Sequence, residues 1–375
     1  MKIGIDGSRA FIEKRTGIEE YSYQVIKNLT TELKEQEVIL YVRKNQQIDF
    51  ELPKNFRVKV INFPKFWTQA GLSLEMFFHP VDTLFIPAHT VPFIHPSNTI
   101  VTIHGLEYEF CPEAYSFFER LYMRFVIKNS CKWAKKVICV SENTKKDVMK
   151  LYGVSREKID VIYEGYVEKI ELEALEIERE ISVIKKCSGN LKGDTLIESL
   201  KPYIFFIGRI EKRKNIEGII EAFNILKEKY GISHQLVLAG GPGFGYEDIK
   251  NKIENSKFKK DIIEKGYVSE KNKWELLKNA DVFVFPSFYE GFGLPILEAQ
   301  NVLTPVVTSN VSSIPEVADE AVLYADPNNT QEIAENIYIL ISNEKAREDI
   351  VKRGLENVKR FSWINCANKI ARLLS

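Results

Sequence analysis

Short apolar runs alternate along the chain with segments in which apolar residues recur every three or four positions. The first pattern is typical of strands and the second of amphipathic helices. The predicted strands are Lys2–Asp6, Val38–Val42, Arg57–Ile61, Thr83–Ile86, Thr99–Ile103, Lys136–Val140, Lys158–Ile162, Tyr203–Ile207, Gln235–Ala239, Ile262–Val268, Asp281–Pro286, Pro305–Thr308 and Ala321–Tyr324. The predicted helices include Ile18–Leu33, Ala114–Ala134, Ile216–Tyr230, Lys271–Asn279, Leu294–Asn301, Thr330–Ile341 and a last amphipathic helix that begins near Trp363. Regular alternation of the two kinds of element predicts an α/β protein.

Several predicted strands contain runs that are apolar at every position, such as Phe205–Ile207 and Val282–Phe285. Strands of this kind are buried on both faces, which favours parallel sheets covered by helices on each side. The pattern occurs in both halves of the chain, so we predict two doubly wound, Rossmann-like domains. The charged stretch Glu168–Lys186 separates the halves and is typical of a solvated helix in a linker. The predicted division is an N-terminal domain, a linker, a C-terminal domain and a terminal helix, at 1–165, 166–200, 201–357 and 358–375.

Length, charge and cysteine content narrow the class of protein. The chain has 375 residues, 52 Lys and Arg against 52 Asp and Glu, and 45% hydrophobic residues. A formal net charge of zero disfavours a nucleic-acid binder with a broad basic surface. The five cysteines show no spacing typical of a zinc site or a disulfide framework. No signal peptide or membrane span is recognisable, so we expect a cytoplasmic protein.

The segment from Asp281 to Glu298 carries the strongest chemical signal. An apolar strand leads into a loop with Gly291 and Gly293, and Pro295 then suits the first turn of a helix. In a parallel sheet this places exposed amides and a helix N-terminus at the carboxyl ends of the strands. Such a site favours a phosphate or diphosphate.

Two carboxylates, Glu290 and Glu298, flank this anion site. Because a carboxylate repels phosphate, we expect both to accept hydrogen bonds from sugar or ribose hydroxyls of the same ligand. The alternative is that Glu298 only complements the helix dipole and Glu290 only lies at the surface.

A second predicted strand end, Gly208, is followed by Arg209 and Lys214. A guanidinium and an ammonium at this edge would bind diphosphate oxygens. We expect Lys212 and Arg213, between them, to form only a solvated basic turn. No Asp-x-Asp motif occurs, so a carboxylate-held Mg²⁺ is not expected and the cations would stabilise the leaving diphosphate themselves.

Glu290-Gly-Phe-Gly-Leu-Pro-Ile-Leu-Glu298, together with Gly208, Arg209 and Lys214, resembles the retaining nucleotide-sugar glycosyltransferases of family four. The resemblance covers nearly the whole chain and is closest to bacterial mannosyl- and rhamnosyltransferases. It implies the GT-B fold, in which two Rossmann-like domains face each other across a cleft and the C-terminal helix crosses back to the first domain. The C-terminal domain would bind a GDP- or UDP-sugar, no cofactor or metal would be needed, and the N-terminal domain would bind a saccharide or lipid-linked acceptor.

The resemblance also implies roles for single residues. Arg209 and Lys214 would bind the donor diphosphate, Glu298 the ribose, and Val268 would lie in the segment that meets the base. Glu290 would contact the transferred sugar, as would His104, and both are candidate catalytic residues. For His104 alone, a histidine satisfied in the core is the alternative. The remaining expected donor contacts are Gly17 in a glycine loop and the segment Gly291, Phe292, Gly293 and Leu294.

Cations and aromatic residues are interleaved between 117 and 150, as in helices that lie on anionic membranes. The alternative is an amphipathic helix whose aromatic residues pack in the core.

The expected activity is transfer of a hexose, with mannose as the preferred guess, in cell-surface polysaccharide synthesis such as that of lipopolysaccharide. Two rivals stay open: a nucleotide-sugar epimerase of the same fold and a catalytically silent nucleotide- or glycan-binding subunit.

Overall fold

The computed structural model describes residues 1–166 and 202–375 of the chain. The chain divides into two units. The first comprises Met1–Gly165 with two later segments, Glu290–Leu294 and Phe361–Ser375, and the second comprises Tyr166–Tyr289 and Pro295–Arg360. Most of the predicted linker, including its solvated helix, lies outside the described residues.

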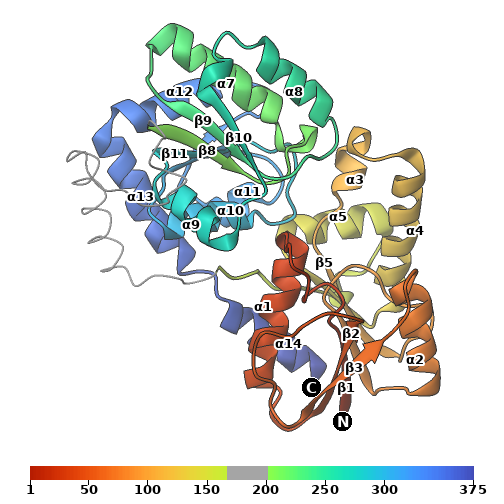
Figure 1. The fold of residues 1–375 in the computed structure, drawn as a ribbon. Coiled ribbons are helices and arrows are strands. Elements are labelled where there is room, and N and C mark those ends of the chain that lie inside the picture. Colours follow the sequence, from red (N-terminus) through yellow and green to blue (C-terminus); the bar gives the residue numbers. More distant parts are fainter. Residues whose placement is uncertain (167–201) are drawn as a thin grey trace. The chain divides into compact units, whose positions relative to one another are not determined.

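The first unit is built on a parallel sheet of seven strands in the order β3-β2-β1-β4-β5-β6-β7 (Figure 1). Their bounds are β1 Lys2–Asp6, β2 Glu37–Arg43, β3 Phe56–Ile61, β4 Thr83–Ile86, β5 Asn98–Ile103, β6 Lys136–Cys139 and β7 Ile159–Val161. The helices are α1 Gly17–Glu32, α2 Ser73–Phe78, α3 Glu107–Phe110, α4 Phe117–Trp133, α5 Glu142–Tyr152 and the returning α14 Trp363–Leu374. Helix α14 packs against α1.

The second unit repeats this arrangement with six parallel strands in the order β10-β9-β8-β11-β12-β13. Their bounds are β8 Tyr203–Ile207, β9 Gln235–Ala239, β10 Ile262–Gly266, β11 Val282–Phe285, β12 Val306–Ser309 and β13 Leu323–Ala325. The helices are α7 Ile216–Tyr230, α8 Tyr246–Asn255, α9 Glu270–Lys278, α10 Leu294–Asn301, α11 Ile314–Ala318, α12 Thr330–Ser342 and α13 Glu344–Val358.

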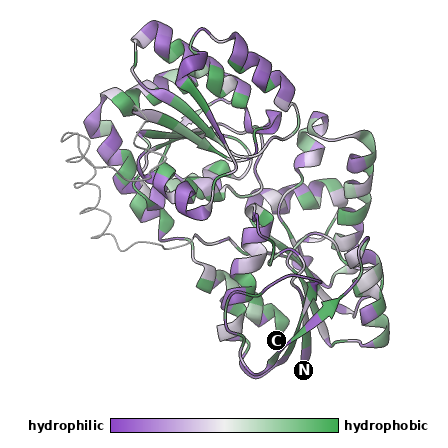
Figure 2. Ribbon diagram, viewed as in Figure 1, coloured by the Kyte–Doolittle hydropathy of each residue, from purple (hydrophilic) through white to green (hydrophobic). Residues whose placement is uncertain are grey.

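Both strand orders are those of the doubly wound fold, so the predicted fold class is confirmed. The central strands are apolar on both faces because helices cover each side, and in Figure 2 they are largely green while the helices carry both colours. Each sheet reverses its strand order once, between β1 and β4 and between β8 and β11. Ligands of this fold bind outside the carboxyl ends of the strands at these switch points.

Two of the differences between predicted and observed bounds have a clear local cause. The helix expected over Ala114–Ala134 begins only at Phe117, because Ser116 and Glu119 form a capping box in which each side chain accepts from the other's backbone N–H. The strand expected to reach Val268 ends at Gly266, whose φ of 63° turns the chain out of the sheet.

Candidate active site

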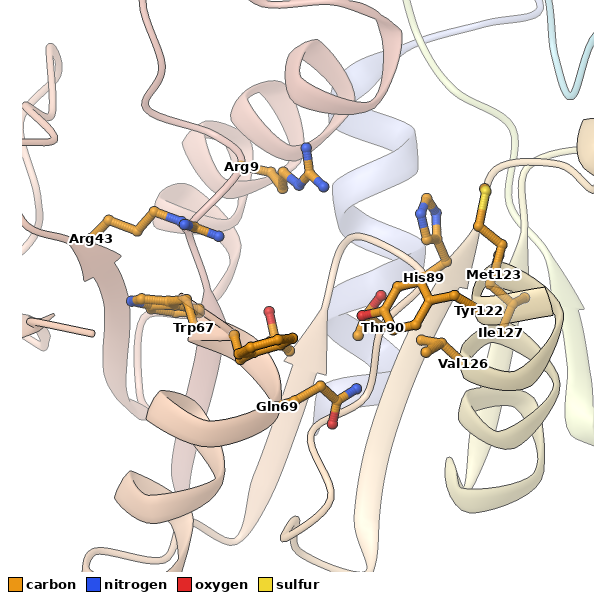
Figure 3. A pocket seen from close by; sticks show the side chains of 12 residues that line it. Arg9, Arg43, Trp67, Gln69, His89, Thr90, Tyr122, Met123, Val126 and Ile127 are labelled. Atoms are coloured by element: carbon orange, nitrogen blue, oxygen red, sulfur yellow. The ribbon is translucent and has the colours of Figure 1, made fainter. Parts of the chain in front are cut away.

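A cavity of about 390 Å³ lies at the switch point of the first unit (Figure 3). Arg9 follows β1, Arg43 ends β2, and His89 follows β4, so all three come from carboxyl ends of neighbouring strands. Trp67 and Tyr122 supply aromatic walls. The volume falls within the range of small-ligand sites, roughly 300–1,000 Å³. This cavity was not predicted from the sequence, although the strand ends at which its polar residues lie were.

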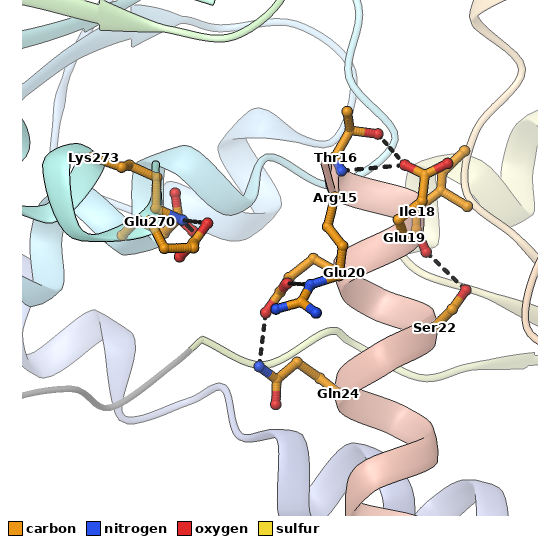
Figure 4. A network of polar contacts seen from close by, with 10 residues as sticks. Arg15, Thr16, Ile18, Glu19, Glu20, Ser22, Gln24, Glu270 and Lys273 are labelled. Carbon is orange, nitrogen blue, oxygen red and sulfur yellow. Dashed lines mark hydrogen bonds and ion pairs between the residues drawn. The ribbon is translucent and has the colours of Figure 1, made fainter. Parts of the chain in front are cut away.

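Gly17 begins helix α1, and a network of polar contacts fixes this helix end (Figure 4). The Glu19 carboxylate accepts from both the backbone N–H and the hydroxyl of Thr16. The next residue, Glu20, accepts from Arg15 Nε at 2.9 Å and from Gln24 Nε2, one turn on, at 2.7 Å. A Cβ built on Gly17 would meet no heavy atom of the described residues within 4 Å. The space beside Gly17 is therefore open to a ligand.

His104 follows β5 and is nearly buried, with 10% of its side chain exposed. Nε2 lies 2.8 Å from the carbonyl oxygen of Pro87, which can only accept, so this nitrogen carries a proton. Nδ1 lies 3.4 Å from Oε1 of Glu164, whose pKa is raised by burial. The Tyr21 ring packs edge-on against the imidazole at 4.5 Å. The ring is thus held in one orientation by contacts on both nitrogens.

The segment Glu290–Leu294 is part of the first unit. The carbonyl oxygen of Gly291 accepts from the hydroxyls of Ser141, at 2.7 Å, and Thr144, at 3.3 Å. Glu290 itself is buried. Phe292 packs with the Phe361 ring at 5.7 Å, which anchors the loop in an aromatic cluster. Side-chain contacts and helix α5 therefore hold this glycine-rich segment in place.

In the second unit, β8 and β9 approach so closely at their carboxyl ends that glycine is required there. A Cβ on Gly240 would lie 1.7 Å from the carbonyl oxygen of Gly208. Arg209 then leaves β8 and is exposed, without a hydrogen bond or ion pair to another described residue. Nζ of Lys214 lies 4.8 Å from the ring centre of Phe285, the last residue of β11. Both predicted diphosphate ligands thus lie at strand ends that flank the switch point of this sheet.

The expectation that Arg213 lies in a solvated turn is wrong. Its side chain is only 14% exposed, and it donates to Glu211 at 2.7 Å and to the carbonyl oxygen of Tyr289 at 2.8 Å. The N–H of Phe288 in turn donates to the Arg213 carbonyl oxygen. Arg213 therefore fixes the loop that leaves β11, whereas Lys212 does lie at the surface, paired with Asp248.

Glu298 on α10 makes a contact that the sequence did not reveal. Its Oε1 accepts from Lys273 Nζ at 2.7 Å, and both side chains are largely buried. Burial opposes the charge on Lys273, but the carboxylates of Glu298 and Glu270 raise its pKa above the usual value. Figure 4 shows the contact between Lys273 and Glu270. Lys273 holds the Glu298 carboxylate in place, which suits a group that accepts hydrogen bonds from a diol.

Val268 follows β10 and packs partly against the core of the second unit. Across residues 1–166 and 202–375, no three His, Cys, Asp or Glu side chains gather as a metal site would require. Nor does any helix in this part of the chain have the length and apolar character needed to span a bilayer.

The comparisons with known proteins agree with this geometry. The family described as Glycosyl transferases group 1 matches residues 189–357, and Glycosyltransferase Family 4 matches residues 17–167. The O-antigen chain mannosyltransferase B of Escherichia coli is 32% identical over 276 residues, which cover 72% of this chain and 68% of that protein. The chain belongs to the family four glycosyltransferases.

A further curated protein and a solved structure are also similar to this glycosyltransferase. The O-antigen chain mannosyltransferase RfbU of Salmonella typhimurium is 25% identical over 76% of this chain and 71% of its own length. The crystal structure of WaaG, a glycosyltransferase involved in lipopolysaccharide biosynthesis, matches the whole chain and 99% of its own with a TM-score of 0.73 at 16% identity. That likeness confirms the GT-B fold for this glycosyltransferase.

Proposed function

We propose that this glycosyltransferase moves mannose from a nucleoside diphosphate sugar, with GDP-mannose as the preferred donor, to a saccharide acceptor in cell-surface polysaccharide synthesis. The observation that carries the proposal is the position of Arg209 and Lys214 at the switch point of the second sheet, where a diphosphate binds in this fold. The names of two relatives, both O-antigen chain mannosyltransferases, support the choice of sugar and pathway class.

In this proposal the second unit binds the nucleotide. Arg209 and Lys214 contact the diphosphate, and Glu298, held by Lys273, accepts from the ribose hydroxyls. Val268 lies beside the base. No metal takes part, so the two cations offset the charge that develops on the leaving diphosphate.

Glu290, His104 and the backbone of Phe292, Gly293 and Leu294 would orient the transferred sugar. We propose retention at the anomeric carbon. The bond from that carbon to the diphosphate oxygen breaks as the acceptor hydroxyl attacks from the same face. The departing diphosphate oxygen takes the proton of that hydroxyl, so no protein nucleophile is required.

The donor assignment predicts a selective thermal shift. Without added metal, a nucleotide or nucleotide sugar at 100 times its Kd should stabilise the protein by about 2.7 kcal/mol. We expect GDP and GDP-mannose to raise Tm, UDP-sugars to do so less, and NAD to have no effect. A protein that responds to none of the nucleotides would contradict the proposal and favour a silent glycan-binding subunit. A response that requires Mg²⁺ would contradict the metal-free mechanism.

We also propose that the enzyme is cytoplasmic and binds the inner face of the membrane through α4. The alternative that the aromatic residues of this region pack in the core is wrong for four of them. Phe117, Phe118, Tyr122 and Phe125 are each more than half exposed. Lys128, on the same helix, is exposed as well. Aromatic side chains beside cations suit an anionic bilayer surface.

Phe118→Ser should weaken binding to vesicles that contain phosphatidylglycerol by about tenfold, because it removes one large side chain from the bilayer interface. Co-sedimentation with vesicles measures the effect. Phe244→Ser, an exposed aromatic position of the second unit, is the matched control and should bind as the unmodified protein does. Equal binding by both variants, or none by the unmodified protein, would exclude the α4 contact.

A further inference from the structure

The cavity of the first unit has no assigned ligand, although it lies at a switch point, where a doubly wound sheet binds its ligands. We propose that it binds the acceptor and selects a saccharide that carries a phosphate or diphosphate ester, whose charge Arg9 and Arg43 meet. This inference rests on the proposed function, since it assigns the acceptor of the same reaction.

The charges of the cavity favour an anion. Among the described residues that line it, two guanidinium groups occur and no carboxylate. A site for a neutral saccharide commonly presents carboxylates and amides, because sugar hydroxyls are good donors. Guanidinium groups instead match phosphate oxygens in geometry and charge.

The carboxylates nearest to these arginines leave them available to a ligand. Arg9 is paired with Glu19 at 3.1 Å but remains 54% exposed. For Arg43, no carboxylate of the described residues lies within 4.0 Å. Asp6 attracts Arg43 from farther away, and its own Oδ1 accepts from the N–H of Ser8. Partial burial lowers the pKa of Arg43, so an anion in the cavity would stabilise its charge.

The rest of the lining suits a sugar ring. The half-exposed ring of Tyr122 offers an apolar face, whereas Trp67 is only 2% exposed and has Arg43 5.4 Å from its ring centre (Figure 3). Burial, with His104 and Arg9 nearby, lowers the pKa of His89 to about 3, so its imidazole is neutral at physiological pH and can both donate and accept. Gln69 donates to the Val91 carbonyl oxygen at 3.1 Å, while its own oxygen has no partner among the described residues.

The opposite wall connects the cavity to the surface of α4. Tyr122, Val126 and Ile127 of this helix line the cavity, while Phe118 and Phe125 of the same helix are exposed. A phosphorylated saccharide could reach the cavity either free or joined to a lipid through its diphosphate. Both sources share the ester group that the arginines would bind.

Binding of two matched probes tests the inference. The full-length protein is first saturated with the nucleotide that stabilises it, so that the donor site is filled, and is then titrated with mannose 1-phosphate or with methyl α-mannoside. We expect the phosphorylated probe to bind at least about tenfold more tightly. Arg43→Gln should remove most of that difference in affinity. If this variant does not fold, Arg9→Gln provides the same test and should have the same effect. Nucleotide affinity should change less than about twofold.

Arg57→Gln is the control, because it removes an equal charge from an exposed strand of the same unit, where Arg57 is 76% exposed. It should leave the affinities of both probes unchanged. The inference would be overturned by equal affinities for the two probes, or by an unchanged affinity of both arginine variants for mannose 1-phosphate. In either case, nucleotide binding would still support the proposed function. Absence of nucleotide binding would instead contradict the function itself. A KM that is lower for a mannosyl diphosphate with a short prenyl chain than for mannose 1-phosphate would identify the lipid-linked source. Equal KM values for the two compounds would identify the free source.

Discussion

Lys214→Ala is expected to lower kcat/KM for sugar transfer by about 10²-fold or more while the protein stays folded. The ammonium group of Lys214 lies over Phe285, at the end of β11, where the proposed diphosphate develops charge as it leaves. An alanine at this position cannot offset that charge. Initial rates with the donor selected by thermal shift measure the loss, and Tm reports on folding.

Lys212→Ala provides a matched control on the same turn. Lys212 pairs with the exposed Asp248 and has no proposed contact with the donor, so its kcat/KM should change less than about threefold. A loss below about threefold for Lys214→Ala would remove the proposed role. A comparable loss in both variants would indicate a general effect of the turn on the site rather than a specific contact with the diphosphate.

The predictable part of the fold is the part that local pattern determines. The strands β1, β4, β8 and β9 occur with the bounds predicted, because each has a short apolar run that is buried on both faces of its sheet. Helix α10 was also predicted residue by residue, since Pro295 marks its first turn. Strand order was predictable only as a class, because parallel pairing depends on contacts far apart in the sequence.

Elements with weak local signals were missed. Helix α5 has a mainly polar sequence, and its two ends are set by the Ser141 N-cap and by Gly153 at φ 66°. Helix α13 is similarly charged and has few buried residues. The segment Trp67–Leu72 forms a π-helical turn, which no simple periodicity describes. In each case capping or tertiary packing, rather than an apolar stripe, determines the structure.

In the candidate site, too, local sequence pattern predicts some residues, while others depend on contacts between distant parts of the chain. The positions of Arg209 and Lys214 near the edge where ligands bind in this fold were predictable, because both follow the apolar strand β8. The structural role of Arg213 was missed because its partners, Glu211 and Tyr289, become neighbours only in the folded sheet. Lys273 was missed for the same reason, since it meets Glu298 across 25 positions of sequence.

Gly17→Leu should separate stability from activity. A leucine at this first helical position removes part of the conformational cost of glycine, which is roughly 1 kcal/mol in a helix interior, and its Cβ meets no heavy atom of the described residues within 4 Å. We therefore expect Tm to stay the same or rise slightly. If the open space beside Gly17 holds the donor phosphate and the acceptor, the new side chain displaces them, and kcat/KM should fall by about 10²-fold or more. Calorimetry and initial rates measure the two effects on the same preparation.

Lys27→Leu is the matched control, because it places the same side chain on an exposed position of the same helix α1. It should retain kcat/KM within about twofold, which separates a local obstruction at Gly17 from a general effect of an added leucine. Full activity of Gly17→Leu would show that no substrate approaches this helix end. A large fall in Tm would show instead that glycine is needed there for folding. No described residue fills the space beside Gly17. Loss of activity with an unchanged or higher Tm is therefore the one result that agrees with a glycine needed to leave room for the ligand rather than for folding.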